Sequence, residues 1–208
     1  GTSALIYAHD LLKANPDKRA AIIALESPTS TFQHDDYSMT NVVSAAIFGD
    51  GVACAILGPD EDHIRPVIKD TGMYHFYDAL HMMGFDLRNT GLKMILDPTV
   101  PQAIEAHFDD IIHPFLKRNN LEVKDVTHFI FHPGGKKIVQ MVEDLLHRLG
   151  RDIDITRQVL KEYGNMSSAT VLYVLEEYLN KEIPSGDKGL MLSFGPGFSA
   201  QRLLLEWK

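Results

Sequence analysis

The sequence predicts an α/β fold built from layers of helices and strands. Two uninterrupted apolar runs, 20–25 and 52–57, have the length of strands that are covered on both faces. Other segments have apolar residues that recur at helical spacing. Alternating strands and helices are typical of layered α/β domains, and 208 residues with 45% apolar content can bury a substantial core.

The first part of the chain is expected to contain a helix, a strand, a second helix and a second strand. Apolar residues at helical spacing begin at Ala4, and Asn15–Pro16 ends that pattern. A buried strand is predicted over 19–26, a short helix over 41–48, and a central strand over 52–57. Because the first residues run at once into the helical pattern, we expect the chain to open inside a helix, with a segment upstream of it.

The rest of the chain is predicted to hold further strands and helices around two tight turns. Residues 64–96 mix short β-type runs with Met82–Phe85, a segment that could cover a pocket or join a sheet. Good capping residues are expected to open the helix that starts at Ser167. The remaining expected elements are a helix over 100–116, a strand over 127–131, helices from 136 to about Leu149, over 155–163 and over 167–179, and an antiparallel pair of strands over 189–194 and 198–207.

Composition and charge exclude several classes of protein. The net charge of −8 argues against broad nucleic-acid binding. The apolar runs are much shorter than the ~20 residues that cross a bilayer. The single cysteine, Cys54, excludes an intramolecular disulfide, and His75 and His81 lack the spacing of a zinc site. We therefore expect a cytoplasmic protein without a metal.

Two polar residues occupy positions where α/β proteins place functional groups. His132 follows a predicted strand directly and precedes Pro-Gly-Gly, at the sheet edge where ligand crevices usually open. It could equally cap a turn. Asn165 stands between Gly164 and a predicted helix, where asparagine commonly acts as an N-cap but can also direct its amide into a site. Taken alone, His132 does not decide between the two roles, and Asn165 favours capping.

Two candidate nucleophiles, a serine and a cysteine, are disfavoured. The segment 197–201, Gly-Phe-Ser-Ala-Gln, is similar to a nucleophile elbow but lacks the second glycine. An α/β-hydrolase also needs a histidine after the serine, and His147 is the last histidine of the chain. Cys54 lies inside an apolar run, where a thiol is usually a small buried hydrophobe.

Four segments together resemble the signatures of the chalcone and stilbene synthase family, the type III polyketide synthases. They are Ile47-Phe48-Gly49-Asp50-Gly51, Phe131-His132-Pro133-Gly134-Gly135, Gly164-Asn165-Met166-Ser167-Ser168-Ala169 and Phe194-Gly195-Pro196-Gly197-Phe198. The resemblance covers nearly the whole chain. It implies a thiolase-like layered α/β/α fold, incomplete at its N-terminus. Residues 1–63 would end the N-terminal half, and 64–208 would form the C-terminal half.

The resemblance also implies a mechanism. The family's nucleophilic cysteine would lie three residues before Gly1 at the start of a helix, where the helix dipole and a nearby imidazole favour the thiolate. His132 would pair with that thiolate. His132 and Asn165 would donate hydrogen bonds to a thioester carbonyl, on which decarboxylation of malonyl-CoA develops negative charge. This chain alone is then expected to be inactive, and coenzyme A thioesters are its expected ligands, with no further cofactor.

An acyl cavity is implied in the same way. Phe48 matches a gatekeeper aromatic of the family, although a phenylalanine beside a turn could simply be core. Met94 stands where plant chalcone synthases carry a second gating phenylalanine, and a flexible methionine suggests a differently shaped mouth. The cavity lining would be completed by Pro28, Thr31, Ser167 and Pro196.

The expected parent enzyme condenses an acyl-CoA starter with malonyl-CoA and cyclises the product. Met94 favours an alkylpyrone or alkylresorcinol over a chalcone. A homodimer is expected for the full-length protein. One alternative is a condensing enzyme similar to ketoacyl-ACP synthase III, which would differ in its donor preference. The other is a non-enzymatic binding module in which His132 and Asn165 are only turn and cap residues.

Overall fold

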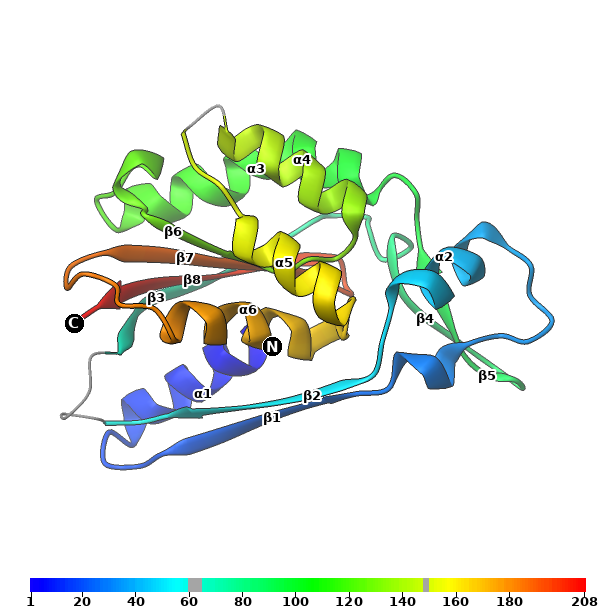
Figure 1. Ribbon diagram of the computed structural model, residues 1–208, viewed down its shortest axis with the longest axis horizontal. Helices are drawn as coiled ribbons and strands as arrows, with labels where there is room; N and C mark the ends of the chain where they lie inside the picture. Colours follow the sequence, from blue (N-terminus) through cyan, green and yellow to red (C-terminus); the bar gives the residue numbers. More distant parts are fainter. Residues whose placement is uncertain (60–64, 148–149) are drawn as a thin grey trace.

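The computed structural model of the chain describes residues 1–59, 65–147 and 150–208 (Figure 1). In these residues the strands form three sheets, and helices lie between and outside them. The elements are α1 (Thr2–Ala14), β1 (Ala20–Glu26), η1, a 3-10 helix (Pro28–Thr31), α2 (Met39–Ile47), β2 (Gly51–Leu57), β3 (Pro66–His75), β4 (Met83–Arg88), β5 (Gly91–Leu96), α3 (Val100–Arg118), η2 (Val123–Asp125), β6 (His128–Phe131), α4 (Lys136–His147), α5 (Asp154–Tyr163), η3 (Ser167–Ala169), α6 (Thr170–Leu179), β7 (Lys188–Gly195) and β8 (Ser199–Trp207).

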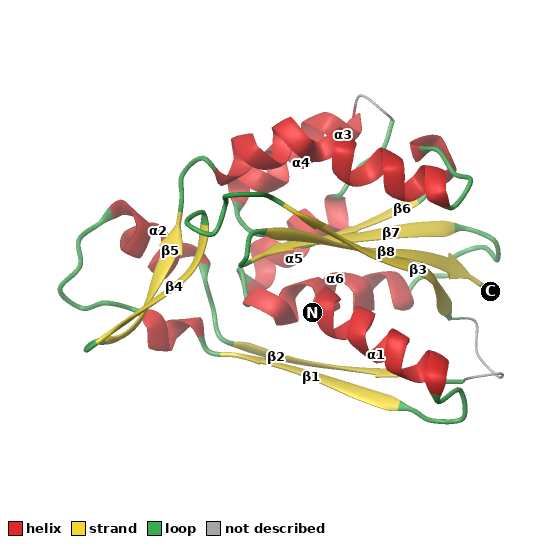
Figure 2. Ribbon diagram, turned by 180° about the vertical axis from the view of Figure 1, so that it is seen from behind, coloured by secondary structure: helices red, strands yellow, loops and turns green. Residues whose placement is uncertain are grey.

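The largest sheet has four strands in the order β3-β8-β7-β6. β6 and β7 are parallel, and the other pairs are antiparallel. Helices α3 and α4 cover one face, whereas α1, α5 and α6 lie on the other (Figures 1 and 2). Alternating side chains of β7 serve both layers: Leu190 and Leu192 belong to the core under α3, and Met191 belongs to the core with α1 and α6. The predicted layered α/β arrangement is therefore observed.

β1 and β2 form a separate antiparallel sheet of two strands. Its inner face contributes Ile22 and Ala24 to the core shared with α1 and α6. Its outer face is exposed, with Ile23 70% and Ile56 71% accessible. The expectation that 52–57 is a central strand covered on both faces is therefore wrong for this chain, because among the described residues helices cover only one side of this sheet.

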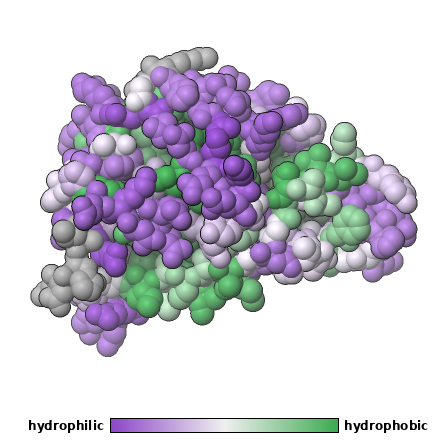
Figure 3. All heavy atoms as spheres, viewed as in Figure 1, coloured by the Kyte–Doolittle hydropathy of each residue, from purple (hydrophilic) through white to green (hydrophobic). Residues whose placement is uncertain are grey.

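The outer face of this sheet corrects a second expectation. Cys54 pairs with Ile23 in the β1–β2 register and is exposed, so it is not a buried hydrophobe. Figure 3 shows apolar surface gathered along the lower edge of the molecule, where Figure 1 places β1 and β2.

A smaller lobe is formed by α2 and the β4–β5 hairpin, at the right of Figure 1. The segment Met82–Phe85 was expected either to join a sheet or to cover a pocket. Most of it forms the start of β4, and Phe85 pairs with Met94 of β5. Met82 is buried in the core under α3. The hairpin contacts η1 and α2, and the connection to the four-stranded sheet runs through the core residues Phe76 and Ala79.

The helix boundaries agree with the sequence patterns except at two points. The last helix begins as the short η3 turn and continues as α6 from Thr170, whose N-cap Ala169 supplies no capping side chain, so the expected capping residues do not open α6 itself. The expected helix end at Leu149 lies outside the described residues. No helix in the described ranges has both the length and the apolar composition of a membrane span.

Candidate functional site

His132 lies at the C-terminal edge of the parallel pair β6–β7. Its backbone N–H donates to the carbonyl oxygen of Leu192 at 2.9 Å, which extends the β6–β7 ladder by one residue. The N–H of Gly134 then donates to the carbonyl oxygen of His132 at 2.9 Å, and this closes a tight turn before α4. The strand–turn–helix arrangement predicted around His132 is therefore observed, with the imidazole at the sheet edge where α/β proteins bind ligands.

The imidazole of His132 is electrically neutral at pH 7. Burial lowers its pKa from 6.5 to about 4. A neutral imidazole has one N–H donor and one acceptor nitrogen. It can therefore donate a hydrogen bond to a carbonyl oxygen without carrying a charge into the site.

Asn165 joins the turn that carries His132 to the start of the last helix. Its side chain is 2% exposed. Nδ2 donates to the carbonyl oxygen of Gly134 at 3.0 Å, and Oδ1 accepts from the N–H of Ser167 at 2.9 Å. The side chain thus caps a local turn and also contacts the His132 turn. Among the described residues, Gly134 is the one hydrogen-bond acceptor for this amide group, which has two N–H donors.

The segment 47–51 meets Asn165 through a short parallel bridge. The N–H of Asn165 donates to the carbonyl oxygen of Ile47 at 2.8 Å, and the N–H of Gly49 donates to the carbonyl oxygen of Asn165 at 3.0 Å. Gly164 has φ +71°, and a Cβ there would lie 3.2 Å from the Ile47 carbonyl oxygen. Glycine is thus the residue that fits this approach. Asn165 therefore hydrogen-bonds its own signature segment to two others, 47–51 and 131–135.

Asp50 anchors the η1 turn next to Phe48. Its carboxylate accepts hydrogen bonds from the backbone N–H of Thr29 at 3.0 Å, from the Thr29 hydroxyl at 2.6 Å and from the Ser27 hydroxyl at 3.3 Å. Hydrogen bonds from Thr29 lower the pKa of the Asp50 carboxyl. No sequence pattern indicated this role of Asp50, because its partners lie 21 to 23 residues earlier in the chain.

A cavity of about 290 Å³ opens between η1, α2 and β5. Four of the residues predicted to line an acyl cavity border it, namely Pro28, Thr31, Phe48 and Met94. Its other lining residues are Thr29, Phe32, Asn41, Ser44 and Ala45. No sequence pattern indicated that this second group lines a cavity, since their positions depend on how α2 folds against β5.

Ser167 and Pro196 do not border this cavity. Ser167 is half-buried and has a left-handed backbone, with φ +52°. Pro196 is exposed in the β7–β8 turn, where Gly197 has φ +123°. The fourth signature segment also supplies core, since Phe198 is fully buried and its ring centroid lies 4.5 Å from that of Phe76.

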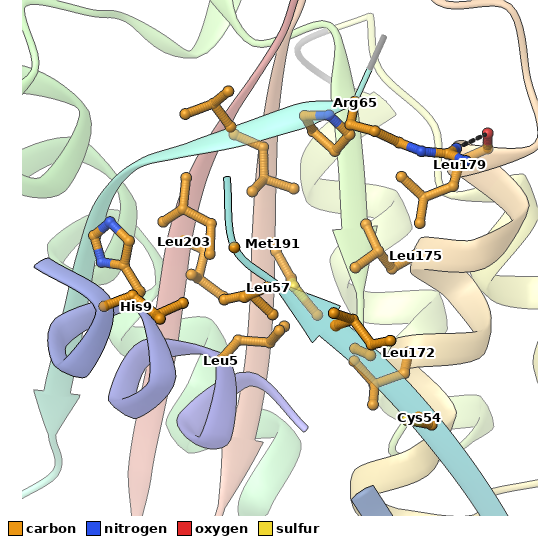
Figure 4. Close-up of a pocket in the computed structure, with 18 of the residues that line it drawn as sticks. Leu5, His9, Cys54, Leu57, Arg65, Leu172, Leu175, Leu179, Met191 and Leu203 are labelled. Carbon is orange, nitrogen blue, oxygen red and sulfur yellow. Dashed lines mark hydrogen bonds between the residues drawn. The ribbon is translucent and has the colours of Figure 1, made fainter. Parts of the chain in front are cut away.

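A larger crevice of about 900 Å³ lies between α1, β2, α6 and the four-stranded sheet (Figure 4). Leu5, Leu172 and Leu203 point into it from three of these elements. None of the predicted site residues borders it. The residues that the sequence connects to chemistry therefore gather elsewhere, around His132, Asn165 and the smaller cavity.

Comparison with known proteins identifies the family. Residues 76–207 match the family described as chalcone and stilbene synthases, C-terminal domain. The resemblance carried by the four signature segments is thereby confirmed.

Individual relatives agree with this match. The putative chalcone synthase of Bacillus subtilis (strain 168) is 32% identical over 216 residues, which cover 100% of this chain and 59% of that protein. The 1,3,6,8-tetrahydroxynaphthalene synthase of Streptomyces peucetius subsp. caesius is 32% identical over 212 residues, which cover 100% of this chain and 56% of that protein.

A solved structure confirms the fold. The 1,3,6,8-tetrahydroxynaphthalene synthase of Streptomyces coelicolor A3(2), a bacterial type III polyketide synthase, superposes with a TM-score of 0.90 at 28% identity. The superposition covers 100% of this chain and 59% of that one. The chain thus has the C-terminal portion of the thiolase-like layered fold, and it spans less than two thirds of the length of these relatives.

Proposed function

This chain belongs to the chalcone and stilbene synthase family of type III polyketide synthases, and from that premise we propose that its parent enzyme condenses malonyl-CoA with an acyl-CoA starter by decarboxylative Claisen chemistry. The observation that carries the proposal is the hydrogen bond from Asn165 Nδ2 to the Gly134 carbonyl oxygen. It joins the segment of Asn165 to the turn of His132, at one edge of the sheet and beside the smaller cavity.

His132 and Asn165 act as paired donors to the thioester carbonyl oxygen of malonyl-CoA. Loss of carbon dioxide leaves an enolate whose negative charge is concentrated on that oxygen. The neutral imidazole, which follows from a pKa of about 4, has an N–H to donate. The second amide hydrogen of Asn165 is the other donor. Fixed donors in a partly buried site stabilise such charge where it forms, and each is worth about 2.7–4 kcal/mol of barrier.

The nucleophile of the proposed reaction is a cysteine outside these 208 residues. Cys54, the single cysteine here, lies on the exposed outer face of β2 and not beside His132. The start of α1 lies close to the Asn165 segment, because a Cβ at Gly1 would be only 2.4 Å from the carbonyl oxygen of Ser168, three residues after Asn165. A cysteine three residues before Gly1 would lie at the N-terminus of this helix, which favours the thiolate. This chain alone is accordingly inactive.

The starter is proposed to be a fatty acyl group, so that the products are alkylpyrones or alkylresorcinols rather than chalcones. Met94 supports this choice, because an unbranched thioether adapts to flexible aliphatic chains. Its sulfur accepts a hydrogen bond from the Ser44 hydroxyl at 3.2 Å, which holds it at the cavity wall. Phe48 lines the same cavity and serves as the gate.

The organisation of the parent enzyme follows the family. Residues 1–63 are proposed to end an N-terminal half and 64–208 to form the C-terminal half, although the boundary itself lies outside the described residues. The two parts have separate sheets, β1–β2 and β3-β8-β7-β6, which supports this division. The parent enzyme is proposed to be a cytoplasmic homodimer.

Product analysis tests the proposed function. The full-length enzyme, with its cysteine-bearing segment, is incubated with malonyl-CoA and acyl-CoA starters of several classes, and products are identified by mass spectrometry. Alkylpyrones or alkylresorcinols from aliphatic starters support the proposal, and chalcones from aromatic starters would overturn the starter assignment. Product formation that survives in both His132→Ala and Asn165→Ala would overturn the catalytic assignment. His113→Ala, an exposed histidine on α3, is the matched control.

A further inference from the structure

The smaller cavity has walls from two parts of the chain that are far apart in sequence. Phe48 and Ser44 belong to the α2 side, and Met94 belongs to β5. Figure 1 shows α2 and the β4–β5 hairpin side by side in the same lobe. The width of the cavity therefore depends on what holds the hairpin against the segment 28–48.

Gln33 makes that connection with its side-chain amide. Nε2 donates to the carbonyl oxygen of Leu92 at 3.3 Å, 59 residues away in sequence. Oε1 accepts a hydrogen bond from the hydroxyl of Thr90. Thr90 lies in the β4–β5 turn and Leu92 lies in β5, four and two residues before Met94. Gln33 is 6% exposed although it lies in a loop, so water does not replace these bonds easily.

Asn41 fixes Gln33 from the other side and itself borders the cavity. Its Oδ1 accepts from the Gln33 N–H at 3.2 Å, and its Nδ2 donates to the carbonyl oxygens of Gln33 at 2.8 Å and Asp36 at 2.7 Å. Asn41 is 8% exposed and lies in the first turn of α2. A hydrogen-bonded path thus runs from the cavity wall on α2 through Asn41 and Gln33 to β5.

An ion pair at the edge of the lobe supports the same junction. Lys93 Nζ lies 2.5 Å from Asp36 Oδ2, and both side chains are largely covered. The hydrogen bond with Lys93 lowers the pKa of Asp36 to about 2, so this pair persists across the neutral range. The Gln33 amide and the Asp36–Lys93 ion pair therefore hold Leu92 and Lys93, consecutive residues of β5, against the same loop.

We infer that Gln33 is a positioning residue that fixes β5 against α2 and thereby sets which acyl groups fit between Met94 and Phe48. The inference rests on the proposed function, in which this cavity receives the starter. Gln33 touches no reacting atom and acts through the position of Met94. Without the Gln33 amide, the hairpin has fewer contacts with the loop and the Met94 wall moves outward. The kcat/KM for longer acyl chains then rises relative to that for short ones.

The test compares acyl-CoA starters of increasing chain length in the full-length enzyme. Gln33→Ala removes both side-chain bonds to the hairpin, and Thr90→Val removes one of them at nearly constant volume. Thr90→Ser keeps the hydroxyl and is the conservative rescue. We expect the ratio of kcat/KM for long over short starters to rise by about five- to tenfold in Gln33→Ala and less in Thr90→Val, in line with the loss of one or two net hydrogen bonds. Thr90→Ser should keep the wild-type ratio.

Malonyl-CoA decarboxylation without a starter separates this inference from the proposed function. Gln33→Ala and Thr90→Val should decarboxylate malonyl-CoA at the wild-type rate, because neither residue contacts His132 or Asn165. If the wild-type enzyme itself neither decarboxylates nor condenses, the proposed function fails. If it condenses starters and the chain-length ratio is the same in wild type, Gln33→Ala and Thr90→Val, the inference about Gln33 is wrong. Should Gln33→Ala fail to fold, the ratio in Thr90→Val decides alone.

Discussion

The hydrogen bonds of Asn165 can be tested in this chain by their effect on stability. Asn165→Ala removes the bond from Nδ2 to the Gly134 carbonyl oxygen and the bond from the Ser167 N–H to Oδ1, at 3.0 and 2.9 Å. The Gly134 carbonyl oxygen and the Ser167 N–H then lose these bonds in a buried region, since the Asn165 side chain is 2% exposed. An unsatisfied buried partner costs about 1–3 kcal/mol, so we expect a loss of about 2–4 kcal/mol in the free energy of unfolding.

Urea denaturation followed by circular dichroism measures this loss in the free energy of unfolding. Two further variants serve as comparisons. Asn165→Ser keeps a short oxygen that can cap the Ser167 N–H but does not reach Gly134, so it should lose about half as much. Asn180→Ala, at the exposed end of α6, should change stability by no more than about 0.5 kcal/mol. The reasoning is refuted if Asn165→Ala costs no more than Asn180→Ala.

Three other predictions concern the same chain. Because the pKa of His132 falls from 6.5 to about 4 on folding, the unfolded state takes up its proton first, so stability should decline as pH falls from 6.5 to 4, by at most about 3 kcal/mol. A pH series of urea titrations should show this decline in wild type and a smaller one in His132→Gln, and the same pH dependence in both proteins would contradict the prediction. Ile23→Lys, on the outer face of β1, should change the unfolding free energy by less than about 0.5 kcal/mol, whereas Ile22→Lys, on the inner face, should cost several times more, and equal losses would contradict the assignment of faces. Cys54 should react with a thiol reagent in the native chain nearly as fast as in urea, since it is exposed, and strong native protection would show that the outer face is covered.

Much of the fold follows from local sequence patterns. The helix that Asn15–Pro16 ends, the strand before His132 and the final pair of strands all lie close to their predicted ranges, because period and turn residues act over a few positions. The positions of His132 after a strand and of Asn165 at a break between helices could also be predicted, since turn residues mark both places in the sequence. Their direct contact through Gly134 could not, because it depends on tertiary packing.

The incorrect predictions have a common physical cause: they depend on contacts with residues far away in the sequence, which local patterns do not reveal. The apolar run 52–57 has the composition of a strand covered on both faces, but coverage is supplied by other elements, and here one face has none among the described residues. Gln33 looks like an ordinary loop residue because its partners, Thr90 and Leu92, lie 57 and 59 residues away. Long-range contacts of this kind are specified by the whole fold.

The rate of malonyl-CoA decarboxylation is the most direct test of the central claim, that His132 and Asn165 stabilise the enolate oxygen. It is measured as acetyl-CoA formation in the full-length enzyme without a starter, so that cavity effects do not enter. We predict that His132→Ala and Asn165→Ala each lower kcat by about 10²–10³-fold, as expected for the loss of one donor to a developing oxyanion. A rate in either variant within about threefold of the wild-type rate, far above what loss of an oxyanion donor allows, would contradict the account.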